Sequence, residues 1–329
     1  MARKKGRSKS VTKAQRTLTY VIPEGTASYL YLDIMRDLSI VNRKLFRQGH
    51  VVGIESIEFA FLAPGDPASP ATLVDTVALT AFTAGDTWPV HNAFVKGKAL
   101  WHQMQDLVLD DNPSVRGKWA DYKIYLDGGH TTATNMRTVD GGAVEYDLGE
   151  WDYSKYVLPQ HEVDPVTGAP DPADVTTAHL IGPDLGVLGA WTSVGLVNAY
   201  QESRATVEIA PNVPTGFSSG FFNLLTDSGS QEPELADVVE DENDYPPYYI
   251  ERYPGADLNG VNPPVAEFAT ATIGSPIGMM TPFLAQCGLI KLIPRAFYQG
   301  AAAPLPEMTV KVTVMPGAYK GIAAIPMGQ

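Results

Sequence analysis

The chain has 329 residues, with 24 Lys and Arg against 37 Asp and Glu, which gives a formal net charge of −13. A single cysteine, Cys287, excludes an internal disulfide framework and a cysteine-based zinc site, and its apolar neighbours predict a buried thiol. The sequence contains neither an apolar run of about eighteen residues nor a signal peptide, so we expect a soluble protein that contacts no membrane.

Positive charge is concentrated at the start of the chain. Residues 1–16 contain seven Lys or Arg and no acid, whereas the remainder holds all 37 acids. This arm has too few hydrophobic side chains to offset the entropy cost of ordering, so we expect it to be disordered alone. Flexible positive charge at one end of an acidic body predicts contacts with nucleic-acid phosphates, through Arg3, Lys4, Lys5, Arg7, Lys9, Lys13 and Arg16.

Three other interpretations of the arm stay open. A mitochondrial presequence is also basic and free of acids, but this segment lacks apolar residues at helical spacing. The group Arg3, Lys4, Lys5 and Arg7 fits a nuclear localisation signal, which is compatible with nucleic-acid binding. A solvated tail without a ligand is the third interpretation.

Two short strands and a helix are predicted after the arm. Residues 17–22 and 28–33 are rich in Tyr, Val, Ile and Leu, which is typical of strands. Apolar residues recur at spacings of three and four between 38 and 46, which predicts a short amphipathic helix that Gly49 ends. The basic face of this helix is a second candidate for phosphate contacts, through Arg43, Lys44 and Arg47.

A long strand with an irregularity follows at 50–62. The alternation of apolar side chains changes phase between Ile54 and Ile57. An extra residue in one strand produces such a phase change, so we predict a β-bulge near Ser56.

The middle of the chain predicts a strand, a long helix and another strand. Residues 73–82 alternate aliphatic side chains with Thr, as strands do. The clearest helical period covers 91–108, and Pro113 ends any continuation. Residues 118–127 alternate apolar and polar side chains, which predicts a strand that ends in an Asp-Gly-Gly turn.

Loop signals and strand signals alternate in the rest of the chain. Residues 159–183 are polar, acidic and rich in Pro, which predicts a loop. Regular structure is predicted again at 194–209, where the periodicity of the opening fits a helix or a strand. Residues 232–244 are strongly acidic and predict a surface loop. Strands are predicted at 289–296 and 308–315.

One motif suggests catalysis. Residues 216–220 read Gly-Phe-Ser-Ser-Gly and match the nucleophile elbow of α/β-hydrolases, with Ser218 as the nucleophile. However, Pro211 and Pro214 lie where that motif needs a buried strand, and all six histidines precede Ser218, against the hydrolase order. We therefore predict that the protein is not an enzyme, and a hydrolase is the weakest alternative.

The sequence contains no strong cofactor or metal signature. No Walker A loop or dinucleotide fingerprint occurs, and the histidines lack metal-ligand spacing. Calcium between subunits is an alternative if the fold brings together Asp110 with Asp111, Glu150 with Asp152, or the run 232–244. Solvated acidic loops are the simpler interpretation. We therefore predict no cofactor.

Aromatic side chains next to a lysine offer one more candidate. Trp119, Tyr122 and Tyr125 flank Lys123 in the predicted strand 118–127, and such a pattern can stack the bases of a single strand. Alternation is also what a half-buried strand requires, so we favour packing in the core.

Three stretches share a resemblance to one protein family. They are LSIVNRKLFRQGHVVGIESIEFAF at 38–61, NAFVKGKALWHQMQDLVLDDNPSVRGKWADYKIYLD at 92–127 and GLVNAYQESRATVE at 195–208. They resemble capsid proteins of circular Rep-encoding single-stranded DNA (CRESS-DNA) viruses. Such capsid proteins are similar to the single jelly-roll coats of small icosahedral viruses, whose basic N-terminal arm faces the packaged genome. The arm of this chain is shorter and less rich in Arg than many in that family.

The expected fold is all-β or β-dominated. The 30 Gly and 26 Pro, spread along the chain, favour many short strands with long irregular connections. A single jelly-roll β-sandwich with one or two helices in its connections fits this pattern and the resemblance. We expect a disordered, genome-facing arm at 1–16 and a shell domain at 17–329, with loop insertions at 159–183 and 227–264.

The expected function follows from the charge split, the strand pattern and the resemblance. We predict a viral capsid protein that self-assembles into a homo-oligomeric icosahedral shell around single-stranded nucleic acid, most simply DNA. Its location would then be the virion, and during assembly the host nucleus. The alternative is a non-enzymatic β-sandwich interaction module of a phage or a cell, with the basic tail as a targeting or solvated segment. That alternative predicts a monomer or a small oligomer.

Overall fold

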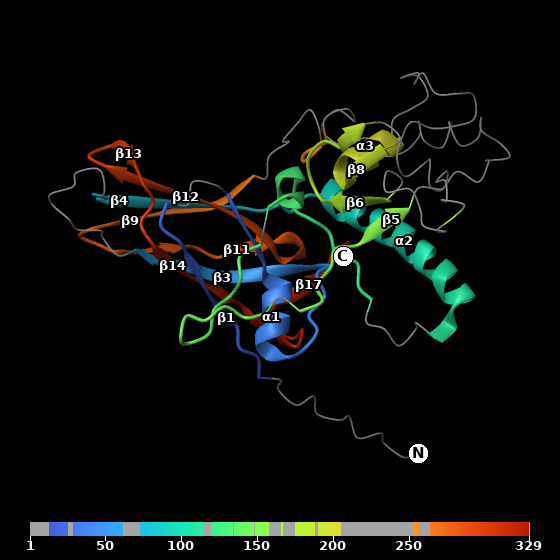
Figure 1. Cartoon of the computed structure of the whole chain (residues 1–329), viewed down its shortest axis with the longest axis horizontal. Helices are drawn as coiled ribbons and strands as arrows, with labels where there is room; N and C mark the ends of the chain where they lie inside the picture. The colour runs from blue at the N-terminus through green and yellow to red at the C-terminus, as the bar shows by residue number, and fades with distance from the viewer. Residues whose placement is uncertain are drawn as a thin grey trace, which may run out of the picture.

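Two antiparallel β-sheets form the larger part of the molecule (Figure 1). The computed structural model describes residues 13–25, 29–61, 73–114, 120–133, 135–147, 149–157, 166, 175–187, 190–204, 253–256 and 264–328. The first sheet has the order β1-β14-β3-β10, and β11 and β17 also pair with β3. Its strands are β1 (Thr17–Ile22), β3 (His50–Phe61), β10 (Ile277–Met280), β11 (Phe283–Ala285), β14 (Met308–Val314) and β17 (Ala324–Pro326).

The second sheet has the order β13-β12-β4-β9, and β2 pairs with β12. Its strands are β2 (Leu30–Asp33), β4 (Thr76–Phe82), β9 (Val265–Thr272), β12 (Leu289–Tyr298) and β13 (Ala301–Ala303). Strands β9 and β10 follow one another in the chain but belong to different sheets. The chain therefore passes from one sheet to the other at the edge that these two strands form.

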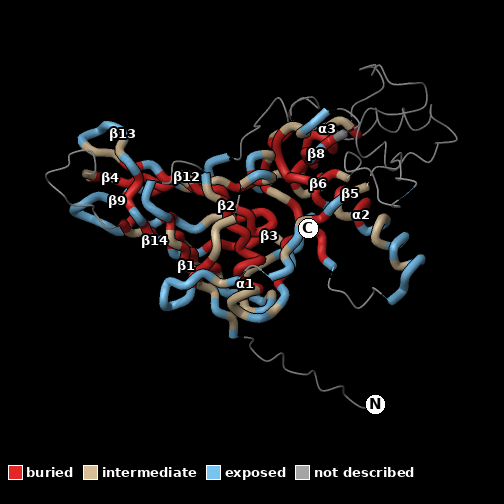
Figure 2. The backbone as a smooth tube through the Cα atoms, in the orientation of Figure 1, coloured by how far each residue is buried: buried red, intermediate tan, exposed pale blue. Residues whose placement is uncertain are grey.

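The sheets enclose one apolar core (Figure 2). Strands β1 and β14 show how the sequence produces it, because alternate side chains of a strand point to the same face. Leu18, Tyr20 and Ile22 of β1 lie opposite Val312, Val310 and Met308 of β14, and all six are at most 1% exposed. Burial of such side chains contributes about 1.5–3 kcal/mol each, so this alternation stabilises the sandwich.

The predicted bulge in β3 is confirmed. Thr313 of β14 pairs with Ser56 and the next residue, Val314, pairs with Ile54, so one residue of β3 is left over. Because of the bulge, apolar side chains on both sides of it point into the core. Ile54 and Ile57 are both fully buried although three positions separate them.

A smaller lobe lies beside the sandwich and contains two helices and a four-stranded sheet (Figure 1). The helices are α2 (Trp88–Asp111) and α3 (Leu196–Arg204). The sheet has the order β5-β6-β8-β7, with a parallel pairing of β6 and β8, and its strands are β5 (Lys155–Val157), β6 (Val175–His179), β7 (Leu185–Val187) and β8 (Ala190–Gly195). Its core is rich in aromatic side chains and includes a hydrogen bond of 2.5 Å between the hydroxyls of Tyr122 and Tyr156.

A buried polar network joins the lobe to the second sheet. Asp127 lies beside a short 3-10 helix, Gly128–Thr131, and accepts a hydrogen bond from Tyr31 Oη of β2 at 2.7 Å. Lys291 of β12 donates to the other carboxylate oxygen of Asp127 at 2.8 Å. The ring of His130 stacks on that of Tyr31 with centroids 4.3 Å apart. The two regions therefore share an ion pair that is almost completely desolvated.

Helix α1 (Ile34–Asn42) continues directly from β2. The side chain of Asp33 caps it by accepting a hydrogen bond from the backbone N–H of Arg36 at 3.1 Å. Arg36 pairs with its buried neighbour Asp37, whose second oxygen accepts from Tyr20 Oη at 2.6 Å. These bonds attach α1 to strand β1. Near the end of the chain, β15 (Pro316–Gly317) and β16 (Gly321–Ile322) form a small hairpin.

The predicted strand at 118–127 is wrong. Residues 115–119 lie outside the described part, and residues 120–124 are extended but form no strand. The segment is buried on both faces, so other groups satisfy its backbone: Lys123 N–H donates to Ser154 Oγ and Ile124 N–H donates to Gln48 Oε1. Only Tyr125 makes a bridge, to His179 of β6. The backbone of Tyr125 also bonds to β6 and its continuation, because Tyr125 N–H donates to the backbone oxygen of Ala178 at 3.0 Å and Leu180 N–H donates to that of Tyr125 at 2.9 Å. Only the end of the segment therefore lies against a sheet.

Other expectations are partly corrected. The predicted loop 159–183 contains strand β6, which pairs with β5 and β8. Within 194–209, the chain completes β8 and then turns into α3, so the ambiguous periodicity contains both elements. The long helix α2 extends beyond 91–108 at both ends. Residues 205–252, which include the run 232–244, lie outside the described residues.

The β-dominated fold class is confirmed, and the jelly-roll connectivity stays a prediction. Cys287 is completely buried, as predicted, and burial raises the pKa of its thiol well above the usual value. Among the described helices, none is both long and apolar enough to span a membrane.

Candidate nucleic-acid interface

The basic residues near α1 lie just after the helix and not on one of its faces. Helix α1 ends at Asn42, and Arg43 takes a left-handed backbone conformation, with φ 51° and ψ 38°. Ser39 holds the following turn, because its backbone oxygen accepts from Lys44 N–H at 3.2 Å and its hydroxyl accepts from Phe46 N–H at 2.8 Å. The prediction of a basic helix face is therefore corrected to a basic turn that contains Arg43, Lys44 and Arg47.

The root of the arm packs against this turn. The side chain of Asn42 exchanges two hydrogen bonds with the backbone of Gln15, at 2.7 and 2.9 Å. Lys44 Nζ donates to the backbone oxygen of Lys13 at 3.2 Å. Lys13, a described residue of the predicted arm set, thus lies beside Lys44 of the basic turn.

Arg16 has a different environment from the other predicted residues. Its guanidinium lies 3.1 Å from Glu55 of β3 and donates to the backbone oxygen of Val314 at 2.7 Å. Its backbone oxygen accepts from Val314 N–H at 2.9 Å. Arg16 therefore anchors the start of β1 to the first sheet. Arg3, Lys4, Lys5, Arg7 and Lys9 lie outside the described residues.

The hairpin near the end of the chain adds a lysine that sequence analysis did not identify. Arg47 N–H donates to Tyr319 Oη at 3.1 Å, and the ring of Tyr319 lies 4.1 Å from that of His50. These contacts place Lys320 beside the basic turn, where its Nζ donates to the backbone oxygen of Leu45. The 275 positions between Leu45 and Lys320 in the chain explain why no local spacing could indicate this contact.

The pKa shifts of His50 and Lys320 reflect burial first and neighbouring charges second. Burial is the main reason that the pKa of His50 is below its usual value, and the charges of Lys98, Lys320 and Arg47 act in the same direction. Burial also lowers the pKa of Lys320, with the charge of Arg47 as the next cause, and the charge of Asp121 acts in the opposite direction. Like charges that disfavour one another favour a bound anion. We define the basic cluster as Lys13, Arg43, Lys44, Arg47, Lys98 and Lys320.

The remaining candidates do not form a second site in the described structure. Ser218 and Trp119 lie outside the described residues. Tyr122 is a core residue, as predicted, whereas Tyr125 is half-buried and stacks on Tyr153 at 3.9 Å between ring centroids. Within the part of the chain that the structure covers, no group of three or more His, Cys, Asp and Glu side chains is arranged to hold a metal ion.

Comparisons with protein-family models, with curated proteins and with solved structures found no match for this chain.

Proposed function

We propose that the protein is a viral coat protein that assembles into a shell around single-stranded nucleic acid. The observation that carries this proposal is the basic cluster, because it gathers at the root of the basic arm and continues its charge onto the folded domain. Phosphates are the ligands that such a cluster favours, since flexible and fixed positive charges both release counterions from a strand. The remainder of the chain is acidic, which disfavours phosphate contacts outside the arm and the basic cluster.

The surface of the sandwich also supports self-assembly. Strands β9 and β10 each end a sheet, and apolar side chains project from these strands, from the turn between them and from β11. Six of them are 45–64% exposed: Val265, Phe268, Ile273, Ile277, Met279 and Leu284. Exposed apolar groups on edge strands are typical of protein interfaces. We assign this strip to the contact between copies of the chain, which a shell requires and which a monomeric interaction module does not.

The experiment for assembly is electron microscopy and sedimentation of the purified full-length protein. We expect closed particles. Met279→Glu adds a charge to the apolar strip and should lower the fraction of protein in particles at least tenfold. Ala302→Glu on β13 adds the same charge at another exposed position and should leave assembly unchanged. A monodisperse monomer or small oligomer of the unmodified chain would contradict the proposal and favour the interaction module.

The experiment for packaging compares the nucleic-acid content of purified particles. Deletion of residues 1–12 removes five basic side chains but keeps 13–16, which bond to α1 and β14. Substitution of Arg43, Lys44 and Arg47 by Gln removes three more charges. Each change should lower the ratio of nucleic acid to protein, and the salt dependence of binding should weaken by about 0.7 per lost phosphate contact. Arg295→Gln, at an exposed position of β12, is the charge control.

Unchanged nucleic-acid content in both variants would contradict the role of the basic cluster. That outcome would not affect the conclusion about assembly, because particle formation and nucleic-acid content are measured independently on the same samples.

A further inference from the structure

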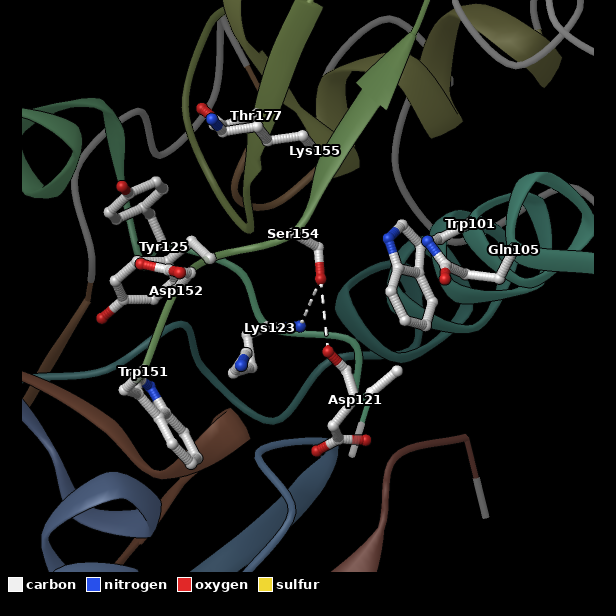
Figure 3. A pocket seen from close by; sticks show the side chains of 12 residues that line it. Trp101, Gln105, Asp121, Lys123, Tyr125, Trp151, Asp152, Ser154, Lys155 and Thr177 are labelled. Carbon is white, nitrogen blue, oxygen red and sulfur yellow. Dashed lines mark hydrogen bonds between the residues drawn. The ribbon is translucent and has the colours of Figure 1, made fainter. Parts of the chain in front are cut away.

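A cavity of about 610 Å³ opens between helix α2 and the segments that connect the lobe to the sandwich (Figure 3). Helix α2 contributes Trp101 and Gln105, and β6 contributes Thr177. Two connecting segments, 120–125 and 151–155, supply the remaining side chains. A volume of this size is in the range of small-ligand sites, which is about 300–1,000 Å³. None of the residues that line this cavity belongs to the basic cluster.

Aromatic rings line opposite sides of the cavity (Figure 3). Trp101 stands on the side of α2, and Trp151 and Tyr125 stand on the side of the connecting segments. Tyr125 is supported by Tyr153, with a ring distance of 3.9 Å and an angle of 25°. Trp151 Nε1 donates to the buried Asp33 Oδ2 at 2.9 Å, which fixes its ring. Rings held in this way are suited to stack on a flat ligand.

The charged groups of the lining balance one another. Asp121 and Asp152 provide two carboxylates, and Lys123 and Lys155 provide two ammonium groups. Lys123 lies 4.9 Å from the ring centre of Trp151. Asp121 Oδ2 is buried and has no hydrogen-bond partner among the described residues. The lining thus carries no net charge, which suits a neutral, planar molecule with donors and acceptors at its edge more than a phosphate.

The cavity adjoins the basic cluster. Arg47 and Lys98 act electrostatically on Asp121, where their charges oppose the increase in pKa that burial causes. Gln48, which follows Arg47 in the chain, bonds to the segment 120–125 and to Asp33. Its Oε1 accepts from Ile124 N–H at 2.6 Å, and its Nε2 donates to Asp33 Oδ2 at 3.1 Å. Arg47 and Lys98 of the basic cluster therefore act on a residue that lines the cavity.

We propose that this cavity binds one unpaired nucleobase of the strand whose phosphates contact the basic cluster. The inference rests on the proposed function and adds a base contact to it. Stacking on aromatic rings accepts any base, because every base has a flat face, so the contact selects single strands over duplexes without selecting a sequence. A saccharide also stacks on aromatic rings, but it carries no phosphate to place beside the cluster, and the nucleobase is therefore favoured.

The test compares two short single-stranded DNA probes of equal length, one with bases and one abasic, in fluorescence anisotropy with the full-length protein at the same salt concentration. The probes have the same phosphates and differ only in the bases. We expect the base-containing probe to bind about 5- to 100-fold more tightly.

Two variants change the cavity in different ways, so that a loss of base binding can be distinguished from a loss of folding. Trp151→Leu removes one stacking ring, and Ala120→Trp fills the cavity from an exposed position without removing a core contact. Each should reduce the difference between the probes to less than threefold and leave binding of the abasic probe unchanged. Ala302→Trp on β13 is the control for an added indole and should keep the full difference.

The possible outcomes distinguish this inference from the proposed function. Equal binding of the two probes by the unmodified protein, with the expected salt dependence, overturns the base site and leaves phosphate binding intact. Binding of neither probe at low salt overturns both. Quenching of Trp151 fluorescence by neutral oligosaccharides, with equal affinity for the two DNA probes, overturns the base site in favour of a carbohydrate site.

Discussion

The sandwich and the lobe are built on different physical principles. The sandwich core contains mainly aliphatic side chains on strands of regular alternation, and its sheets satisfy most of their own backbone groups. The lobe contains many aromatic side chains, and the segment 120–127, which connects it to the sandwich, bonds to side chains such as Ser154 and Gln48. A buried ion pair, Asp127 with Lys291, joins the two regions.

This difference indicates which regions of the molecule hold the candidate sites. Regular sheets leave few buried polar groups unpaired, so the sandwich offers a rigid frame and an apolar edge. Irregular backbone brings polar and aromatic side chains together from distant parts of the chain. The cavity accordingly lies in the lobe, and the basic cluster lies where α1, α2 and the terminal hairpin meet.

The largest expected effect comes from breaking the ion pair between the two regions. Asp127→Ala leaves Lys291 buried without its carboxylate, which should lower the free energy of unfolding by about 3–5 kcal/mol. Urea denaturation can follow the regions separately, because all four described tryptophans, Trp88, Trp101, Trp151 and Trp191, lie in the lobe or beside it, whereas circular dichroism reports mainly the sheets.

The control for this variant is Glu58→Ala, which breaks the exposed pair of Glu58 with Lys311 on the first sheet. We expect a cost of about 0–1 kcal/mol there, because water screens exposed charges. A cost for Asp127→Ala no larger than for Glu58→Ala would show that the network does not couple the regions.

The second effect is a loss of stability of the lobe in acid. Burial lowers the pKa of His179 to about 4, and His179 bonds to Ser193 Oγ and to the backbone oxygen of Pro183. Because the folded pKa is below the unfolded value, the stabilisation is complete above about pH 6.5 and is lost as pH falls through 4. The full effect is about 3 kcal/mol.

His179→Gln should make the pH dependence of the free energy of unfolding shallower between pH 6.5 and 4, whatever its cost at neutral pH. Comparison of slopes is needed because Asp37, whose pKa burial raises to about 6, contributes in the opposite direction: its stabilisation is present below about pH 4 and is lost as pH rises through 6. Parallel curves for the variant and the unmodified protein would contradict a neutral, buried His179.

The smallest effect tests how closely the sandwich core is packed. Ile57→Val removes one buried methylene beside the bulge and should cost about 0.5–1.5 kcal/mol, with the fluorescence and dichroism transitions shifted equally. A larger shift of the dichroism transition alone would mean that the sandwich unfolds independently of the lobe.

Sequence patterns predicted the sandwich better than the lobe. In β3 the phase change between Ile54 and Ile57 indicated the bulge, because alternation along a strand is a local property. The same reasoning failed at 118–127, because the polar side chains Asp121 and Lys123 are buried together with the apolar ones, so the alternation did not mark an exposed face of a strand. For the candidate site, the order of residues indicated Arg43, Lys44 and Arg47, but it placed them on a helix face and not in the turn after α1.

The sequence by itself determined the separation of charge between the arm and the body, the β-rich class and the buried state of Cys287, because composition and near-neighbour periodicity are sufficient for these. Only the tertiary structure decided that Lys320 joins the basic turn and that Trp101 faces Trp151 across a cavity. These contacts connect residues far apart in the chain, and their geometry depends on how the sheets and helices pack, which no local spacing specifies.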